Sequence, residues 1–208
     1  MPARIPRLGW AIAFLVVAGL IAFGYANFQK ASPSAPRMDK LALVPDFQFT
    51  DQYNRPLALT DLKGKVWVTD FIFTRCPGPC PIMTGHLSEL NKALGDRKDV
   101  EIVSFTVDPE FDTPAVLKKY GERAGATEQR WKFLTGPREQ IDKVVTKGFM
   151  QALGQDPNGL PMHSTRFLVV DRNGWIRALE SKDDPQLVSK LLMDIDDLLR
   201  EPQTASQK

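Results

Sequence analysis

The chain has 208 residues, with 27 basic and 25 acidic side chains, two cysteines and two histidines. This length allows one ordinary domain with an appendage, and the near balance of charge offers no basic stripe to which a nucleic-acid backbone would bind. Two cysteines exclude a disulfide-rich scaffold, and a structural zinc site would have to use every cysteine and histidine of the chain.

The first predicted element is a membrane-spanning helix over residues 8–29. This range holds no charged side chain, and as a helix with a rise of about 1.5 Å per residue it would cross a bilayer core. Residues 1–7 carry two arginines and are expected to stay on the cytoplasmic side of an inner membrane. The single-pass anchor would place the rest of the chain in the periplasm or an equivalent oxidising compartment. A cleavable signal peptide is the alternative, because Gly24 and Ala26 are small residues at a position suited to cleavage.

A linker is predicted after this span, over residues 30–43. Its composition is rich in Ser, Pro and Ala and poor in large apolar side chains, so it is expected neither to pack nor to form a helix. The folded domain is expected over residues 44–199, and the polar residues 200–208 are expected to form a flexible tail.

Strand and helix patterns alternate within the predicted domain. They indicate a hairpin, a central strand rich in β-branched and aromatic residues, a helix, a second strand, a second helix, a second hairpin and a closing helix, at residues 46–60, 66–73, 83–94, 100–107, 113–123, 166–179 and 184–198. This alternation predicts an α/β domain with a thioredoxin-like fold.

Two cysteines follow the predicted central strand directly. Residues 73–81 read FTRCPGPCP, which places Cys76 in a stiff proline-rich loop and Cys80 near the cap of the first long helix. Because proline disfavours the α conformation in the residue before it, the helix is not expected to begin much before Pro81. The helix N-terminus would then favour thiolate over thiol at both sulfurs. The spacing alone allows a redox-active pair, a merely stabilising disulfide or a shared soft metal ion.

The cysteine motif resembles the Sco/SenC family, whose members have a thioredoxin fold and are associated with copper delivery to cytochrome c oxidase. Residues 104–114, which read SFTVDPEFDTP, and residues 163–167, which read HSTRF, are similar to the second and third blocks of that family. The resemblance covers roughly residues 44–199. One departure is Gly78, where the family commonly has an acidic residue, and this would alter the charge near a metal without removing a ligand.

The resemblance implies that Cys76, Cys80 and His163 bind one copper ion. Two thiolates and one imidazole suit copper as Cu(I) or as Cu(II). His163 lies just before a predicted strand, where thioredoxin-like folds usually have a cis-proline that faces the redox cysteines, and Ser164 takes the place of that proline. His86 is six positions beyond Cys80, so on a helix it would face away as a surface or packing residue.

Three acidic residues are weighed for a role beside the ligands, and two of them, Asp70 and Asp108, are the candidates for tuning the ligands without binding the metal. Asp70 precedes Cys76 by six residues in an otherwise apolar strand, and it is either a base that assists the less exposed thiol or a hydrogen-bonded strand residue. Asp108 and Asp112 follow the neighbouring strand and either reach the rim of the site or form turns and caps. Of these two, Asp108 is the better candidate.

The function implied by the resemblance is that of a membrane-anchored copper metallochaperone. Its partner would be the copper-containing subunit of cytochrome c oxidase, with other copper chaperones or thiol reductants as further partners. The alternative is a thiol–disulfide oxidoreductase in which Cys76 and Cys80 reduce the copper-site cysteines of the oxidase. The two activities are compatible, so the sequence leaves open whether the protein is an enzyme. A peroxidase is disfavoured, because Phe73 stands where such enzymes typically carry threonine.

Overall fold

The computed structural model describes residues 17–20, 38–157 and 159–202. The chain divides into two units, Met1–Arg37 and Met38–Lys208. Apart from residues 17–20, the predicted N-terminal segment and membrane span lie outside the described residues, as do residues 30–37 and 203–208. Within the described ranges, no helix is both long enough and apolar enough to cross a membrane.

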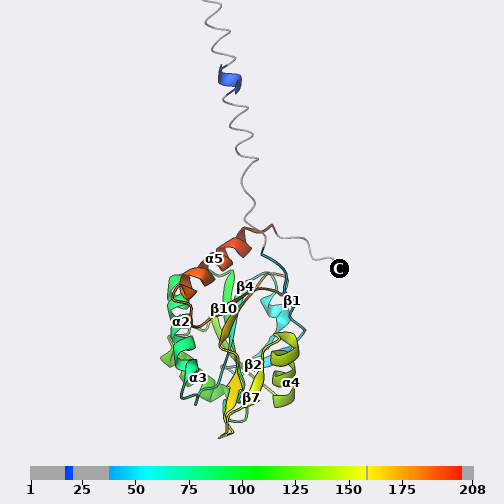
Figure 1. The fold of residues 1–208 in the computed structure, drawn as a ribbon, viewed down its shortest axis with the longest axis vertical. Helices are drawn as coiled ribbons and strands as arrows, with labels where there is room; N and C mark the ends of the chain where they lie inside the picture. The colour runs from blue at the N-terminus through cyan, green and yellow to red at the C-terminus, as the bar shows by residue number, and fades with distance from the viewer. Residues whose placement is uncertain (1–16, 21–37, 158, 203–208) are drawn as a thin grey trace, which may run out of the picture. The chain divides into compact units, whose positions relative to one another are not determined.

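The second unit is built on a mixed sheet of eight strands in the order β1-β10-β9-β4-β5-β6-β2-β3 (Figure 1). The strands β4, β5 and β6 are parallel, and the other neighbouring pairs are antiparallel. A separate hairpin is formed by β7 and β8. The strand bounds are β1 Ala42–Leu43, β2 Gln48–Asp51, β3 Pro56–Ala58, β4 Val66–Ile72, β5 Val100–Thr106, β6 Trp131–Thr135, β7 Leu153–Gln155, β8 Pro161–His163, β9 Arg166–Val170 and β10 Trp175–Ser181.

Helices cover both faces of this sheet (Figure 1). One face carries α2, α3 and α5, and the other carries α4 with the π-helix η2 that continues it. Because β4, β5 and β6 are adjacent and follow one direction across the sheet, right-handed crossovers place both connecting helices, α2 and α3, on the same face. The bounds are η1 Leu59–Leu62, a 3₁₀-helix, α2 Pro79–Ala93, α3 Pro114–Arg123, α4 Arg138–Lys143, η2 Val144–Gly148 and α5 Leu187–Arg200.

The predicted thioredoxin-like arrangement is present. The strands β4, β5, β9 and β10 with the helices α2 and α5 form its core, and β4 lies at the centre with every residue buried. A strand covered on both faces has no polar side to present to water, which is why β4 is apolar except at Thr69 and Asp70. The elements that the sequence patterns did not indicate are β1, η1, β6, α4, η2 and the β7–β8 hairpin.

The helix α2 begins at Pro79, two residues ahead of Pro81, and Pro81 lies in its first turn as predicted. The first N–H groups of a helix have no partner within the helix, so prolines at positions 79 and 81 remove no hydrogen bond there. Cys80 therefore lies inside the first turn of α2 and not before it. The folded unit also begins at Met38, ahead of the predicted start at residue 44, since β1 already pairs with β10.

Candidate functional site

The two cysteines lie at the carboxyl end of β4. Cys76 is half-buried in the loop between β4 and α2, and its N–H donates to the carbonyl oxygen of Phe73 at 3.1 Å. Cys80 is fully buried in the first turn of α2. Both are free thiols. The pair therefore combines one sulfur that solvent can reach with one that lies behind it.

The structure brings His163 to the buried cysteine. The Nε2 atom of His163 lies 3.3 Å from the Sγ of Cys80, although the two residues are 83 positions apart in the chain. The other ring nitrogen, Nδ1, lies 2.8 Å from the carbonyl oxygen of Ser164. A carbonyl only accepts hydrogen bonds, so Nδ1 carries the proton and the neutral ring directs the lone pair of Nε2 toward the sulfur. This is how a ring nitrogen is held when histidine binds a metal.

His163 ends β8, the second strand of the short hairpin, and the aromatic ring of Phe73 packs against it. The two ring centroids are 5.9 Å apart in an edge-on arrangement. Phe73 itself directly follows β4, so the same segment that leads to Cys76 also supports the imidazole. In the described part of the chain, no three His, Cys, Asp or Glu side chains are already arranged to hold a metal ion.

The protonation states of this pair follow from burial. Burial raises the pKa of the Cys80 thiol, and a hydrogen bond with Cys76 raises it further. The expectation that the helix N-terminus would favour thiolate at both sulfurs was therefore wrong for Cys80, because loss of hydration outweighs the field of the helix end. Burial lowers the pKa of His163. In the metal-free protein at neutral pH, Cys80 is thus a thiol beside a neutral imidazole.

Asp70 lies fully buried in β4, the strand that leads to the cysteine loop. Among the described residues, neither carboxyl oxygen has a hydrogen-bond partner. Burial raises the pKa of Asp70 to about 7. The Ser104 hydroxyl, opposite Asp70 in β5, lowers this pKa only in part, because it does not form a hydrogen bond with the carboxyl group. A negative charge on Asp70 would raise the pKa of Cys80, so the protons of the two groups are linked.

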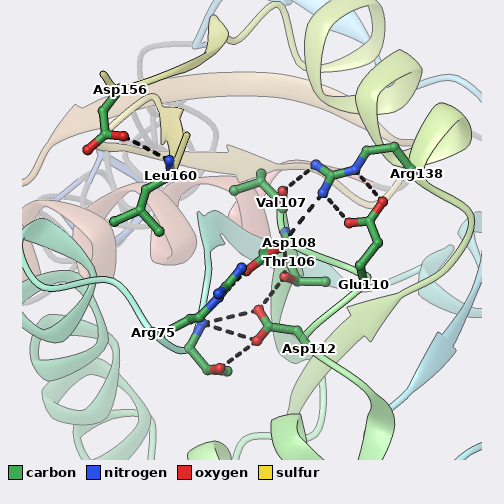
Figure 2. Close-up of polar contacts among 10 residues, drawn as sticks. Arg75, Thr106, Val107, Asp108, Glu110, Asp112, Arg138, Asp156 and Leu160 are labelled. Atoms are coloured by element: carbon green, nitrogen blue, oxygen red, sulfur yellow. Dashed lines mark hydrogen bonds and ion pairs between the residues drawn. The ribbon is translucent and has the colours of Figure 1, made fainter. Parts of the chain in front are cut away.

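Asp108, the other acid singled out by the sequence, reaches the site through Arg75 (Figure 2). Its carboxylate accepts a hydrogen bond from Nε of Arg75 at 2.8 Å and lies 3.7 Å from Arg138. Arg138 also pairs with Glu110 and donates to the carbonyl oxygen of Val107. Asp108 therefore belongs to an ion-pair network at the rim of the site, and its link to the cysteine loop is Arg75, the residue before Cys76.

Asp112 is the site residue whose role sequence reasoning underestimated (Figure 2). It is fully buried and holds Thr74, in the cysteine loop, and Thr106, at the end of β5. The pattern that could have indicated this is a threonine at the carboxyl end of each of two apolar parallel strands, because these ends meet at one edge of the sheet. His86, by contrast, packs edge-on against Phe167, away from the sulfurs as predicted.

Comparison with known proteins gives a consistent result. The SCO1/SenC family model matches residues 35–199. The SCO1 protein homolog of Bacillus subtilis is 39% identical over 137 residues, which cover 64% of this chain and 70% of the relative.

Two solved structures are similar in fold as well. BsSco, a member of the Sco family of cytochrome c oxidase assembly proteins in which a disulfide switch has been identified, is 33% identical with a TM-score of 0.69, over 77% of this chain and 95% of its own. Copper-bound ScoI of Bradyrhizobium japonicum is 26% identical with a TM-score of 0.65, over 76% of this chain and 99% of its own.

Proposed function

The chain belongs to the SCO1/SenC family, and from that premise we propose that it is a copper metallochaperone that delivers one copper ion to the copper centre of cytochrome c oxidase. The proposed ligands are Cys76, Cys80 and His163. The observation that carries the proposal is the 3.3 Å approach of His163 Nε2 to Cys80 Sγ, with the lone pair of the nitrogen directed at the sulfur.

The chemistry of this ligand set suits an ion that must be held and then released. Thiolates are soft ligands that select Cu(I), and imidazole also suits Cu(II). Three protein ligands leave room for a ligand of the acceptor, so copper can pass by stepwise exchange. Cys76 is the more exposed sulfur and is where the acceptor would first reach the ion. Each thiol loses its proton when it binds copper.

The membrane location that we propose is inferred from the amino-acid sequence. A single-pass anchor over residues 8–29 would hold the domain at the inner membrane, facing the periplasm or an equivalent oxidising compartment. The folded unit provides a fixed point for such a tether, because the guanidinium of the buried Arg177 donates to the carbonyl oxygens of Met38 and Asp39.

Substitution of His163 tests the ligand set. Purified full-length chain in detergent is expected to bind one copper ion and to show an intense thiolate-to-copper absorption band with Cu(II). His163→Ala is expected to lose that band and to bind Cu(II) at least about a hundredfold more weakly, since even groups that only orient a ligand contribute about 10–100-fold. His86→Ala is the matched control and should bind as the wild type does. An unchanged copper affinity in His163→Ala would remove the histidine from the site.

A second function, thiol–disulfide oxidoreductase, is favoured by the unequal exposure of the two free thiols. Cys76 as thiolate would attack a substrate disulfide and release one substrate thiol. Cys80 would then attack the mixed disulfide, which releases the second substrate thiol and forms the Cys76–Cys80 disulfide. The charge of Asp70 is coupled to the Cys80 thiol, so we propose Asp70 as the base for the Cys80 proton, which would pass through a bridging water.

The same histidine variant separates the two functions. His163→Ala is expected to reduce a model disulfide peptide within about threefold of the wild-type rate, because no step of thiol exchange needs the imidazole as a ligand. Cys76→Ser is expected to abolish the reaction, since it removes the attacking sulfur. The rates are measured by the appearance of substrate thiol. A His163→Ala variant that lost disulfide reduction and copper binding together would contradict this division of roles.

A further inference from the structure

A single buried carboxylate ties the cysteine loop to the neighbouring strand. The Asp112 carboxylate accepts a hydrogen bond from the backbone N–H of Thr74 at 3.1 Å and another from the Thr74 hydroxyl at 2.5 Å. It also accepts one from the Thr106 hydroxyl at 2.5 Å, and Thr106 ends β5 (Figure 2). The loop after β4 and the end of β5 are thus joined through one side chain.

This arrangement constrains the position of Cys76 closely. Thr74 precedes Cys76 by two residues, and the N–H of Cys76 itself closes a turn onto the carbonyl oxygen of Phe73. The backbone between β4 and Cys76 is therefore held by two hydrogen bonds, one donated by the N–H of Thr74 and one by the N–H of Cys76. Burial of a carboxylate costs free energy unless hydrogen-bond donors surround it. Asp112 is fully buried, and two of its three donors belong to Thr74 in the cysteine loop.

Asp108 is a weaker candidate for the same task. It binds the side chain of Arg75, whose guanidinium is about half exposed and lies over the ring of Phe111, 4.6 Å from its centroid. Although Asp108 is buried, solvent competes for the exposed Arg75, so this ion pair holds a side chain and contributes little to a fixed loop geometry. Asp112 instead binds the backbone N–H of Thr74, so a longer hydrogen bond at this point would shift the loop that carries Cys76.

From these contacts we infer that Asp112 is a positioning residue that sets the distance of Cys76 from Cys80, and so sets both copper affinity and the ease of disulfide formation. The inference rests on the proposed function for its copper arm, whereas its thiol arm needs no copper. Removing the constraint lets the loop sample positions in which the two sulfurs are too far apart to share an ion or to bond.

Two threonine variants provide a matched test. Thr74→Val and Thr106→Val each delete one hydroxyl that donates to Asp112, but only Thr74 lies in the cysteine loop. Asp112→Asn weakens both connections, and Thr74→Ser restores the hydroxyl of the loop. For each full-length variant, copper affinity is measured by competition with a chelator. The equilibrium of the Cys76–Cys80 disulfide is measured without copper against glutathione and its disulfide, in which one oxidised glutathione yields two reduced molecules per protein disulfide formed.

Asp112→Asn is expected to weaken copper binding and to lower the disulfide equilibrium constant by about 10–100-fold each, the range for groups that orient a ligand. Thr74→Val should shift both in the same direction by about three- to tenfold, Thr74→Ser should recover them, and Thr106→Val should leave both within about twofold. Equal shifts in the two valine variants, or loss of thermal stability with unchanged disulfide equilibrium, would overturn the inference. If the wild type bound no copper, the proposed function would fail while the thiol equilibrium still decided the role of Asp112.

Discussion

Replacement of Cys80 by serine is expected to lower copper affinity at pH 7 by about a thousandfold or more and to remove about one unit from the slope of log affinity against pH. The first effect follows from loss of a sulfur ligand, which exceeds the 10–100-fold contribution of groups that merely orient ligands. The second follows from burial, which raises the pKa of Cys80, so that the metal-free thiol is protonated across the neutral range.

The sign of the pH dependence can be worked out from the two shifts. Copper displaces the Cys80 proton, so each unit rise in pH favours binding by about tenfold for this group. His163 contributes less to this slope than Cys80, because burial lowers the pKa of the ring and so favours its neutral form as pH rises through the neutral range. Wild-type affinity should therefore rise with pH, measured by chelator competition at pH 6, 7 and 8. A Cys80→Ser variant with the wild-type slope would show that another group releases the proton.

Folding of the serine variant is the necessary control, since Cys80 is fully buried. Serine places a hydroxyl at this position, and a buried hydroxyl without a partner costs about 1–3 kcal/mol. Cys80→Ala avoids that cost and should show the same loss of copper affinity and the same reduced slope. Agreement between the serine and alanine variants would assign both effects to the missing sulfur.

The second large effect is expected from Asp70→Asn on stability. In the folded protein the pKa of Asp70 is raised from 3.8 to about 7, so the unfolded chain loses this proton at lower pH than the folded one. As pH rises from 4 to 8 the unfolded state therefore binds fewer protons, and the wild type loses stability through this group. The shift corresponds to about 4 kcal/mol at most. Asp70→Asn cannot ionise and escapes this loss.

The measurement compares free energies of unfolding in urea at pH 4 and pH 8. The stability of Asp70→Asn relative to the wild type should rise by up to about 4 kcal/mol between these two pH values. Asp183→Asn is the control, because Asp183 is exposed, and its difference from the wild type should change by less than about 0.5 kcal/mol. A difference for Asp70→Asn that stayed constant with pH would mean that the buried acid is ionised at pH 4.

The role that we propose for the destabilising Asp70 carboxyl is in the chemistry of the two thiols. Asp70 is fully buried and has no hydrogen-bond partner among the described residues, so no hydrogen bond offsets the cost of its charge. Its proton is linked to that of Cys80, and a carboxyl with a pKa near 7 can both accept and return a proton at neutral pH. Stability lost at this position is thus consistent with the thiol chemistry proposed for the pair.

Local patterns determined most of the elements of this fold. The apolar run of β4, the Asn173-Gly174 turn and the helical spacing of apolar residues in α2 and α5 act through neighbours a few positions away, so their structure can be read without knowing the rest of the chain. Two opposing local effects compete at the start of α2. Proline restrains the residue before it, but a helix tolerates proline throughout its first turn.

The cysteine motif and its resemblance to a family are sufficient to name the three candidate ligands, their chemical type and the loop-to-helix setting of the sulfurs. Whether the imidazole meets a sulfur depends on β9 returning beside β4 and on the hairpin that ends at His163, a contact across 83 positions. Thr74 and Asp112 likewise meet across 38 positions. These pairings and the proton on Cys80 depend on the folded domain as a whole, because strand order sets long-range distances and enclosure by the domain sets the loss of hydration.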